Sequence, residues 1–112
     1  MTEKMKIIDF LRENQLDAIF VQKDENCRYL SKFTGSDSYL LLTKEELYLL
    51  TDSRYTEQAR KESADYTVVD YKGHLAEIVA KLAGEYHIKT MGVETVFSYQ
   101  MYLSFHEYMP NI

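Results

Sequence analysis

Two apolar runs separated by three charged residues constrain the fold of this chain more than any other feature. They are residues 39–43 (Tyr-Leu-Leu-Leu-Thr) and 47–51 (Leu-Tyr-Leu-Leu-Thr), and Lys44-Glu-Glu46 joins them. This pattern predicts a β-hairpin with a short charged turn. Because the runs are apolar throughout, both strands should be buried on two faces and lie inside a sheet rather than at its edge.

The segments around the hairpin predict alternating helices and strands. Apolar residues at helical spacing predict a helix from Thr2 to about residues 14–15, and residues 17–21 form a buried strand. A short helix or a turn is expected at 23–32, followed by a loop at 33–38 in which Gly35 supplies a free backbone angle. The elements expected downstream are a helix at 54–62, a strand at 66–70, a helix at 75–82, a strand at 90–94 and a helix capped by Ser98 and stopped by Pro110. About five strands and four helices in this order favour an α/β fold.

The size and composition of the chain fit one domain over residues 1–112. Its net charge is −5, and its lysines and arginines are scattered, which argues against a nucleic-acid partner. No apolar run approaches the roughly 20 residues that a membrane span needs. Its single cysteine, Cys27, cannot form an internal disulfide, and this indicates a reducing, cytoplasmic environment.

The residues that could carry chemistry do not form a recognisable active site. The three histidines, His74, His87 and His106, lack metal-ligand spacing, and Cys27 is expected to pack rather than react. Three carboxylates could sit at the ends of predicted strands and bind Mg²⁺ for nuclease-like chemistry: Asp52, Asp70 and Glu94. The favoured interpretation is that Asp52 caps a helix and the other two are solvated loop acids. From the residues alone, a binding or assembly role is the default.

Two segments resemble a known family. They are Asn26-Cys-Arg-Tyr29-Leu-Ser-Lys-Phe33-Thr-Gly35-Ser36 and Leu49-Leu-Thr-Asp52-Ser-Arg54-Tyr55-Thr-Glu-Gln58-Ala59. Together with the hairpin between them and Gly92-Val-Glu94, they resemble the N-terminal domain of the creatinase/prolidase family, the Xaa-Pro peptidases. The match is in order and spans nearly the whole chain. One departure is Ser31-Lys32, which stands where the family pattern has Thr-Gly.

The resemblance implies a fold and a function for the longer protein. The fold would be a three-layer α/β sandwich of the ribonuclease H-like kind, with a mixed, largely buried sheet and helices on both faces. The full protein would be a homodimeric, metal-dependent Xaa-Pro dipeptidase of the cytoplasm. Its catalytic "pita-bread" domain, C-terminal to these residues, would hold two divalent ions (Mn, Co or Zn) through Asp, His and Glu side chains. These residues would then bind no metal themselves, and would contribute dimerisation and restriction of substrate access.

The resemblance also assigns roles to individual residues. The loop that would approach a substrate or a partner carries Phe33, Asp37 and Tyr39. For each of these, a plain structural role is favoured: a core residue, a turn acid and the first residue of a strand. The other matching residues are expected to be structural: Asn26, Tyr29, Gly35, Ser36, Asp52, Arg54, Tyr55 and Glu94. Among these, Arg54 is expected to be a buried partner of Asp52 or Glu94.

Other functions remain open at the level of the sequence. The same resemblance is compatible with the N-terminal domain of an Xaa-Pro aminopeptidase, of a creatinase or of a family member without enzymatic activity. A stand-alone metal nuclease built on Asp52, Asp70 and Glu94 is a further alternative. It requires the three carboxylates to lie close together.

Overall fold

The computed structural model describes residues 3–35 and 37–112 of the chain. Within them, the elements are α1 (Glu3–Glu13), β1 (Ala18–Val21), α2 (Asp24–Ser31), β2 (Tyr39–Thr43), β3 (Leu47–Thr51), the 3₁₀ turn η1 (Ser53–Tyr55), α3 (Thr56–Glu62), β4 (Thr67–Asp70), α4 (Leu75–Glu85), β5 (Met91–Val93) and α5 (Tyr99–Tyr108). All the predicted strands are present. The segment at 23–32 is the helix α2, so the described chain has one more α-helix than the sequence tally.

The five strands form one mixed sheet in the order β4-β3-β2-β1-β5. Strands β2 and β3 form the predicted antiparallel hairpin, with Leu40 opposite Leu49. Thr43 closes its charged turn, because its hydroxyl accepts from the Glu46 amide at 2.8 Å and donates to the Glu46 carbonyl at 2.8 Å. Strand β4 pairs with β3 and strand β1 with β2, so both hairpin strands lie inside the sheet, as predicted.

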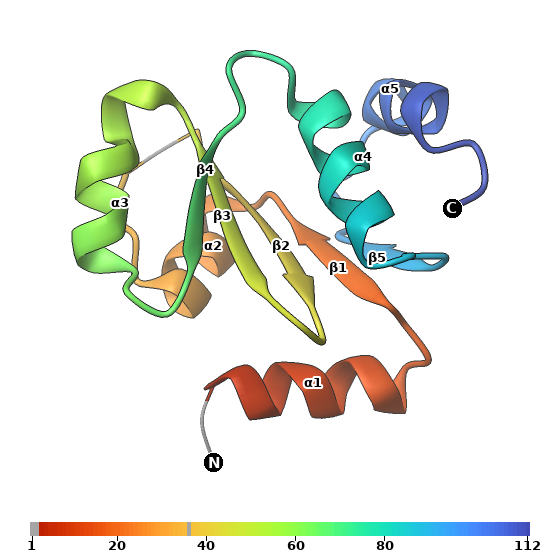
Figure 1. Ribbon diagram of the computed structural model, residues 1–112, viewed down its shortest axis with the longest axis horizontal. Coiled ribbons are helices and arrows are strands. Elements are labelled where there is room, and N and C mark those ends of the chain that lie inside the picture. Colours follow the sequence, from red (N-terminus) through yellow and green to blue (C-terminus); the bar gives the residue numbers. More distant parts are fainter. Residues whose placement is uncertain (1–2, 36) are drawn as a thin grey trace.

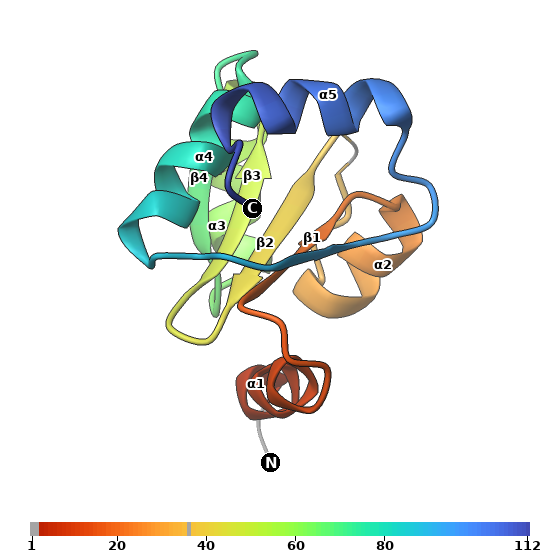
Figure 2. The same cartoon turned by 90° about the vertical axis from the view of Figure 1, so that its right-hand side faces the viewer.

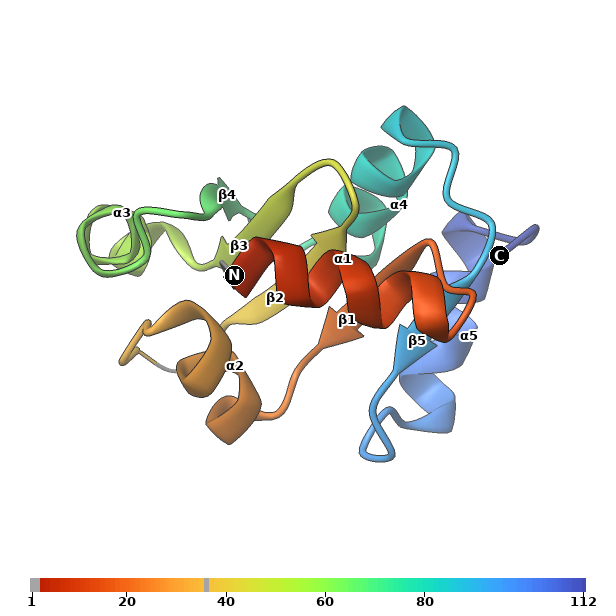
Figure 3. The ribbon, with the colours of Figure 1, turned by 90° about the horizontal axis from the view of Figure 1, so that it is seen from below.

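Helices cover both faces of the sheet and make three layers. Helices α4 and α5 lie on one side, and α1, α2 and α3 lie on the other (Figure 1, Figure 2). Seen from below, α1 crosses the central strands (Figure 3). Successive side chains of a strand point to opposite faces, so β1, β2 and β3 feed two cores. Phe20, Leu41 and Leu50 point to the α4–α5 side, and Val21, Leu40 and Leu49 point to the other. The three-layer α/β fold is therefore confirmed.

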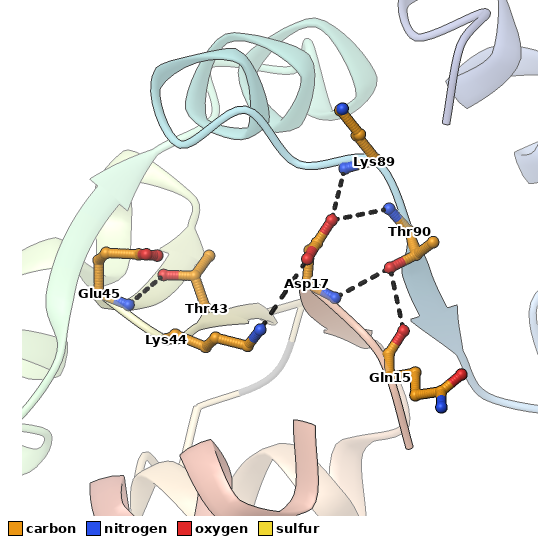
Figure 4. A network of polar contacts seen from close by, with 7 residues as sticks. All are labelled: Gln15, Asp17, Thr43, Lys44, Glu45, Lys89 and Thr90. Carbon is orange, nitrogen blue, oxygen red and sulfur yellow. Dashed lines mark hydrogen bonds and ion pairs between the residues drawn. The ribbon is translucent and has the colours of Figure 1, made fainter. Parts of the chain in front are cut away.

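A carboxylate fastens the start of β1 to the start of β5 (Figure 4). Asp17 accepts hydrogen bonds from the amides of Lys89, at 2.9 Å, and Thr90, at 3.3 Å. In return, the Asp17 amide donates to the Thr90 hydroxyl at 3.0 Å. On the other side, Lys44 of the hairpin turn lies 4.0 Å from the Asp17 carboxylate. This network joins three segments that are distant in the sequence.

No helix in the described part of the chain is both long and apolar enough to cross a membrane.

The Asp17 network makes stability depend on pH in the acid range. The hydrogen bond from the Lys89 amide, helped by the one from the Thr90 amide and by the charge of Lys44, holds the pKa of Asp17 below its usual value. The network therefore stabilises the fold above the ordinary carboxyl pKa of about 4, and its contribution is lost as the pH falls through the lower, folded-state pKa.

We expect Asp17→Asn to lower the free energy of unfolding at neutral pH by about 0.5–1 kcal/mol, a modest loss because the carboxylate is partly exposed. The difference from the parent chain should shrink between about pH 4 and pH 2. Urea unfolding at several pH values measures both effects. A difference that stays constant down to pH 2 would contradict the assignment.

Candidate functional site

The residues that match the family pattern gather at one edge of the sheet. Strand β3 is parallel to β4, and β1 is parallel to β5. Since β2 is antiparallel to both β1 and β3, all four of these strands end at the same edge. Asp52–Tyr55 follow β3, Glu94 follows β5, and the loop at residues 33–38 enters β2 there. In α/β sheets, binding sites form at this edge, beyond the carboxyl ends of the strands.

Glu94 and Asn26 form a lock between the last strand and the helix that follows the first strand. One carboxylate oxygen of Glu94 accepts from the amides of Gln22, at 2.6 Å, and Lys23, at 2.8 Å. The other accepts a short hydrogen bond from the Asn26 side chain. The carboxylate therefore accepts from the two backbone amides that immediately precede α2. The dipole of this helix also favours negative charge there.

The charge of Glu94 is stabilised by this lock. Partial burial by itself would raise the pKa of Glu94, but the hydrogen bonds from Asn26 and from the amides of Gln22 and Lys23 together outweigh it, and the pKa is lowered. The structural role expected for Asn26 and Glu94 is thus explained by one interaction between residues 68 positions apart. The interpretation of Glu94 as a solvated loop acid was wrong, because both of its carboxylate oxygens are engaged. The backbone donors from Gln22 and Lys23 are a part of the lock that the sequence did not indicate.

Asp52, Arg54 and Tyr55 form a compact turn after β3. One carboxylate oxygen of Asp52 caps η1 by accepting from the Arg54 amide at 2.9 Å, and it also accepts from the Arg54 Nε at 3.0 Å. The guanidinium lies 5.2 Å from the centre of the Tyr55 ring. The expected pairing with Asp52 is present, but the side chain of Arg54 is 66% exposed. The expectation of a buried ion pair was wrong, because the turn directs Arg54 out of the sheet edge.

The loop at residues 33–39 begins with a buried anchor. Phe33 is 1% exposed and packs in the core beneath α3, so it fills the structural role favoured for it. Gly35 leaves room for that ring, because a Cβ on Gly35 would lie 2.8 Å from Phe33 Cε2 and closer still to Cζ. Gly35 is not among the glycines with a positive φ, so this close approach, and not the expected free backbone angle, accounts for a glycine here. Ser36 lies outside the described residues.

Polar contacts from α3 hold the same end of the loop. Glu62 accepts from the amide of Thr34 at 2.8 Å and from its hydroxyl at 3.0 Å. Gln58 donates to the Thr34 hydroxyl at 3.2 Å. The hydrogen bond from the Thr34 amide, the largest influence, lowers the pKa of Glu62. No sequence pattern indicated a role for Glu62, whose partner is 28 positions away.

The far end of the loop leads into β2 through Asp37, Ser38 and Tyr39. Asp37 is exposed and has a left-handed backbone, with φ of 56°. Tyr39 is half-buried and stacks on Phe20 with 5.6 Å between ring centroids. The thiol of Cys27 lies 3.6 Å from the Ser38 carbonyl oxygen. Burial raises the pKa of Cys27 to about 12, so the thiol stays protonated and packs, as expected.

The proposal that Phe33, Asp37 and Tyr39 meet a substrate or a partner stays a prediction, with Asp37 the most exposed of the three.

Tyr29, by contrast, is not packed inside the domain. Its side chain is 72% exposed on α2, beside an apolar groove of about 410 Å³ between α1 and α2. Lys32 lies over its ring at 5.3 Å from the centre. Tyr29, a residue of the motif that matches the family, therefore lies on the surface.

The carboxylates at this edge do not form a metal site. Asp52 and Asp70 end neighbouring strands, but β2 and β1 separate β3 from β5 and hence from Glu94. Each carboxylate also has its own partner, and Asp70 accepts from the Lys72 amide at 2.8 Å. Over residues 3–35 and 37–112, no group of three or more His, Cys, Asp or Glu side chains is placed to hold an ion. The stand-alone metal nuclease is therefore excluded for the described residues.

The fold and this edge define the class of protein: an α/β domain of the kind that forms the N-terminal part of Xaa-Pro peptidases. Solved peptidase structures superpose on it closely. An Xaa-Pro dipeptidase from Bacillus anthracis is 32% identical, with a TM-score of 0.82 over 93% of this chain and 31% of that one. An Xaa-Pro aminopeptidase from Streptococcus thermophilus is 28% identical, with a TM-score of 0.85 over 96% and 84%. The N-terminal domain of the cytoplasmic peptidase PepQ from Mycobacterium tuberculosis is 27% identical, with a TM-score of 0.85 over 96% and 85%.

The chain belongs to the creatinase/prolidase N-terminal domain family, whose model matches residues 5–112. The resemblance drawn from the sequence is confirmed. The aligned region makes up between 17% and 30% of the length of the curated relatives that this chain matches.

The departure from the family pattern at Ser31-Lys32 has a visible consequence. Lys32 ends α2 with φ of 68°, the left-handed conformation that favours glycine at this position of a helix. A side chain with a Cβ makes this conformation costly. The missing glycine therefore leaves backbone strain at the entrance to the loop.

We expect Lys32→Gly to raise the free energy of unfolding by about 0.5–1 kcal/mol. The matched control is Lys32→Ala, which loses the same side-chain contacts with Tyr29 but keeps the strained backbone, and should be no more stable than the parent. Urea unfolding of the three proteins measures the difference. Equal stability of the glycine and alanine variants would refute the role of strain.

For the lock, we expect Glu94→Ala to lower the free energy of unfolding by about 1–2 kcal/mol, because the Gln22 and Lys23 amides and Asn26 lose their acceptor. The control is Glu25→Ala, which removes an exposed ion pair with Lys23 and one acidic side chain from the first turn of α2, and should lower stability by no more than about 0.5 kcal/mol. If both variants unfold at the same urea concentration, the contacts of Glu94 do not contribute to the free energy of unfolding.

Proposed function

We propose that this chain is the non-catalytic N-terminal domain of a metal-dependent Xaa-Pro dipeptidase and that it restricts access to the catalytic site and contributes to a homodimer. The observation that carries this proposal is the family match over residues 5–112, which aligns the chain with a minor part of much longer Xaa-Pro peptidases. The Pyrococcus horikoshii Xaa-Pro dipeptidase, for example, is matched over 27% of its length. The remainder of such a protein has room for the catalytic domain.

The two divalent ions of the proposed reaction would be held outside these residues. The described carboxylates at the sheet edge are separated by strands and engaged by backbone or arginine donors, so they do not fit a two-metal site. We assign Mn, Co or Zn to the C-terminal domain. There the ions would activate a hydroxide for attack on the Xaa-Pro peptide bond.

The geometry of the loop at residues 33–39 supports a role in substrate access. Its entrance is held by the buried Phe33 and by Glu62, and its exit is held by Tyr39, which stacks on the core. Asp37 is exposed between these anchors and can face the ammonium group of a short peptide. A fixed wall beside a metal site would limit the length of the peptide that enters.

Exposed aromatic residues support a role in contacts with the catalytic domain or a second subunit. Tyr29 on α2 and Tyr99 on α5 are each more than 70% exposed, and Tyr99 stacks on Tyr102. Aromatic side chains of this kind are enriched at protein interfaces. The single cysteine, which cannot form an internal disulfide, and the likeness to a peptidase described as cytoplasmic support a cytoplasmic location.

An Xaa-Pro aminopeptidase is the second candidate, because the Streptococcus thermophilus aminopeptidase superposes as well as the dipeptidases do. The two activities differ in the length of the substrate, so one comparison separates them.

We expect the complete gene product, supplied with Mn²⁺, to hydrolyse Ala-Pro much faster than Ala-Pro-Ala. The 112-residue chain alone should hydrolyse neither and should show no tight Mn²⁺ or Co²⁺ binding by calorimetric titration. Preference for the tripeptide would favour the aminopeptidase. No cleavage by the complete protein with Mn²⁺, Co²⁺ or Zn²⁺ would refute the peptidase assignment, and a stoichiometric metal site in the 112-residue chain would refute the non-catalytic role.

A further inference from the structure

Tyr71 connects the sheet to the exposed end of the loop at residues 33–39. It is the first residue after β4, and its amide donates to the Thr51 carbonyl at 3.2 Å, which continues the pairing of β4 with β3. Its hydroxyl donates to the backbone carbonyl of Asp37 at 3.4 Å, the long end of hydrogen-bond distances. The backbone of Tyr71 is thus fixed by the sheet while its hydroxyl reaches the loop.

An aromatic column fixes the ring of Tyr71. The ring packs edge-on against Tyr39 with 5.8 Å between centroids. Tyr39 in turn stacks on Phe20, which is fully buried in the core under α5. Burial, followed by the nearby Tyr39 and the charge of Asp37, raises the pKa of Tyr71, so its hydroxyl remains a donor. The position of this hydroxyl is therefore set by the core of the domain.

Asp37 needs such a contact more than an ordinary loop residue does. Its left-handed backbone, with φ of 56°, is unfavourable for a residue with a Cβ, although aspartate tolerates it better than most. The neighbouring Ser38 carbonyl faces the thiol of Cys27 at 3.6 Å. The backbone at 37–38 is thus held from two elements, by Tyr71 after β4 and by Cys27 in α2.

We propose that Tyr71 is a positioning residue, which holds the backbone of Asp37 so that the Asp37 carboxylate is presented to the ammonium group of a peptide substrate. The functional half of this inference rests on the proposed function of the domain. The structural half concerns only the 112-residue chain and can be tested without any activity.

The structural test measures amide hydrogen exchange at Asp37 and Ser38 in the 112-residue chain. Tyr71→Phe removes only the hydroxyl and should accelerate exchange by about two- to fivefold, the effect of one weak hydrogen bond. Tyr71→Leu also removes the ring and should accelerate it further. The matched control is Tyr86→Phe, which removes the hydroxyl paired with Tyr48 at 2.8 Å and should leave exchange in the loop unchanged. Unchanged exchange in both Tyr71 variants would overturn the inference.

The functional test uses the complete gene product with Mn²⁺ and Ala-Pro. Tyr71→Phe should raise KM about two- to fivefold and leave kcat within twofold, because the contact of Asp37 with the ammonium group binds substrate and transition state equally and does not take part in the metal chemistry. Asp37→Asn should raise KM at least as much, and Tyr86→Phe should not change it. Faster exchange with an unchanged KM would overturn the presentation of Asp37 to substrate. An inactive parent protein would instead refute the proposed peptidase, while the exchange data still decide whether Tyr71 holds the loop.

Discussion

Burial of the central hairpin on both faces is the constraint on which the rest of the domain depends. Leu40, Leu41, Leu49 and Leu50 are fully buried, yet they point alternately to opposite sides of the sheet. Two strands of this kind are stable in water only when helices cover both faces and further strands cover both edges. The α4–α5 layer, the α1–α3 layer and the flanking strands β1 and β4 meet this requirement.

The central hairpin also determines where loops are available for function. Because β1, β3, β4 and β5 end at one edge, that edge collects the Glu94 lock, the turn at Asp52 and the loop at residues 33–39. Each of these is fastened by backbone hydrogen bonds to a carboxylate or by an aromatic contact with the core. Contacts of this kind suit a wall beside a catalytic domain, and they are consistent with the proposed role in limiting substrate access.

The motif residues at this edge are recognisable in the sequence, but local patterns do not show which of them are exposed or how closely they pack. Arg54 was expected to be a buried partner of Asp52 or Glu94; it pairs with Asp52 but is exposed, and this exposure depends on the path of the 3₁₀ turn. The sequence suggests that Gly35 supplies a free backbone angle, whereas in the structure the neighbouring Phe33 ring leaves no room for a side chain at position 35. The missing glycine at Lys32 was noted as a departure, and the structure shows its effect as a left-handed helix end.

The sequence by itself determined the order and type of the strands, the buried hairpin and the family, because these follow from local apolar patterns and short motifs. Only the tertiary structure decided which distant residues meet. The Asn26–Glu94 lock, the Glu62 contacts with Thr34 and the reach of Tyr71 to Asp37 join residues between 28 and 68 positions apart. No local pattern encodes such pairs, since they depend on how the strands are ordered and how the layers pack against them.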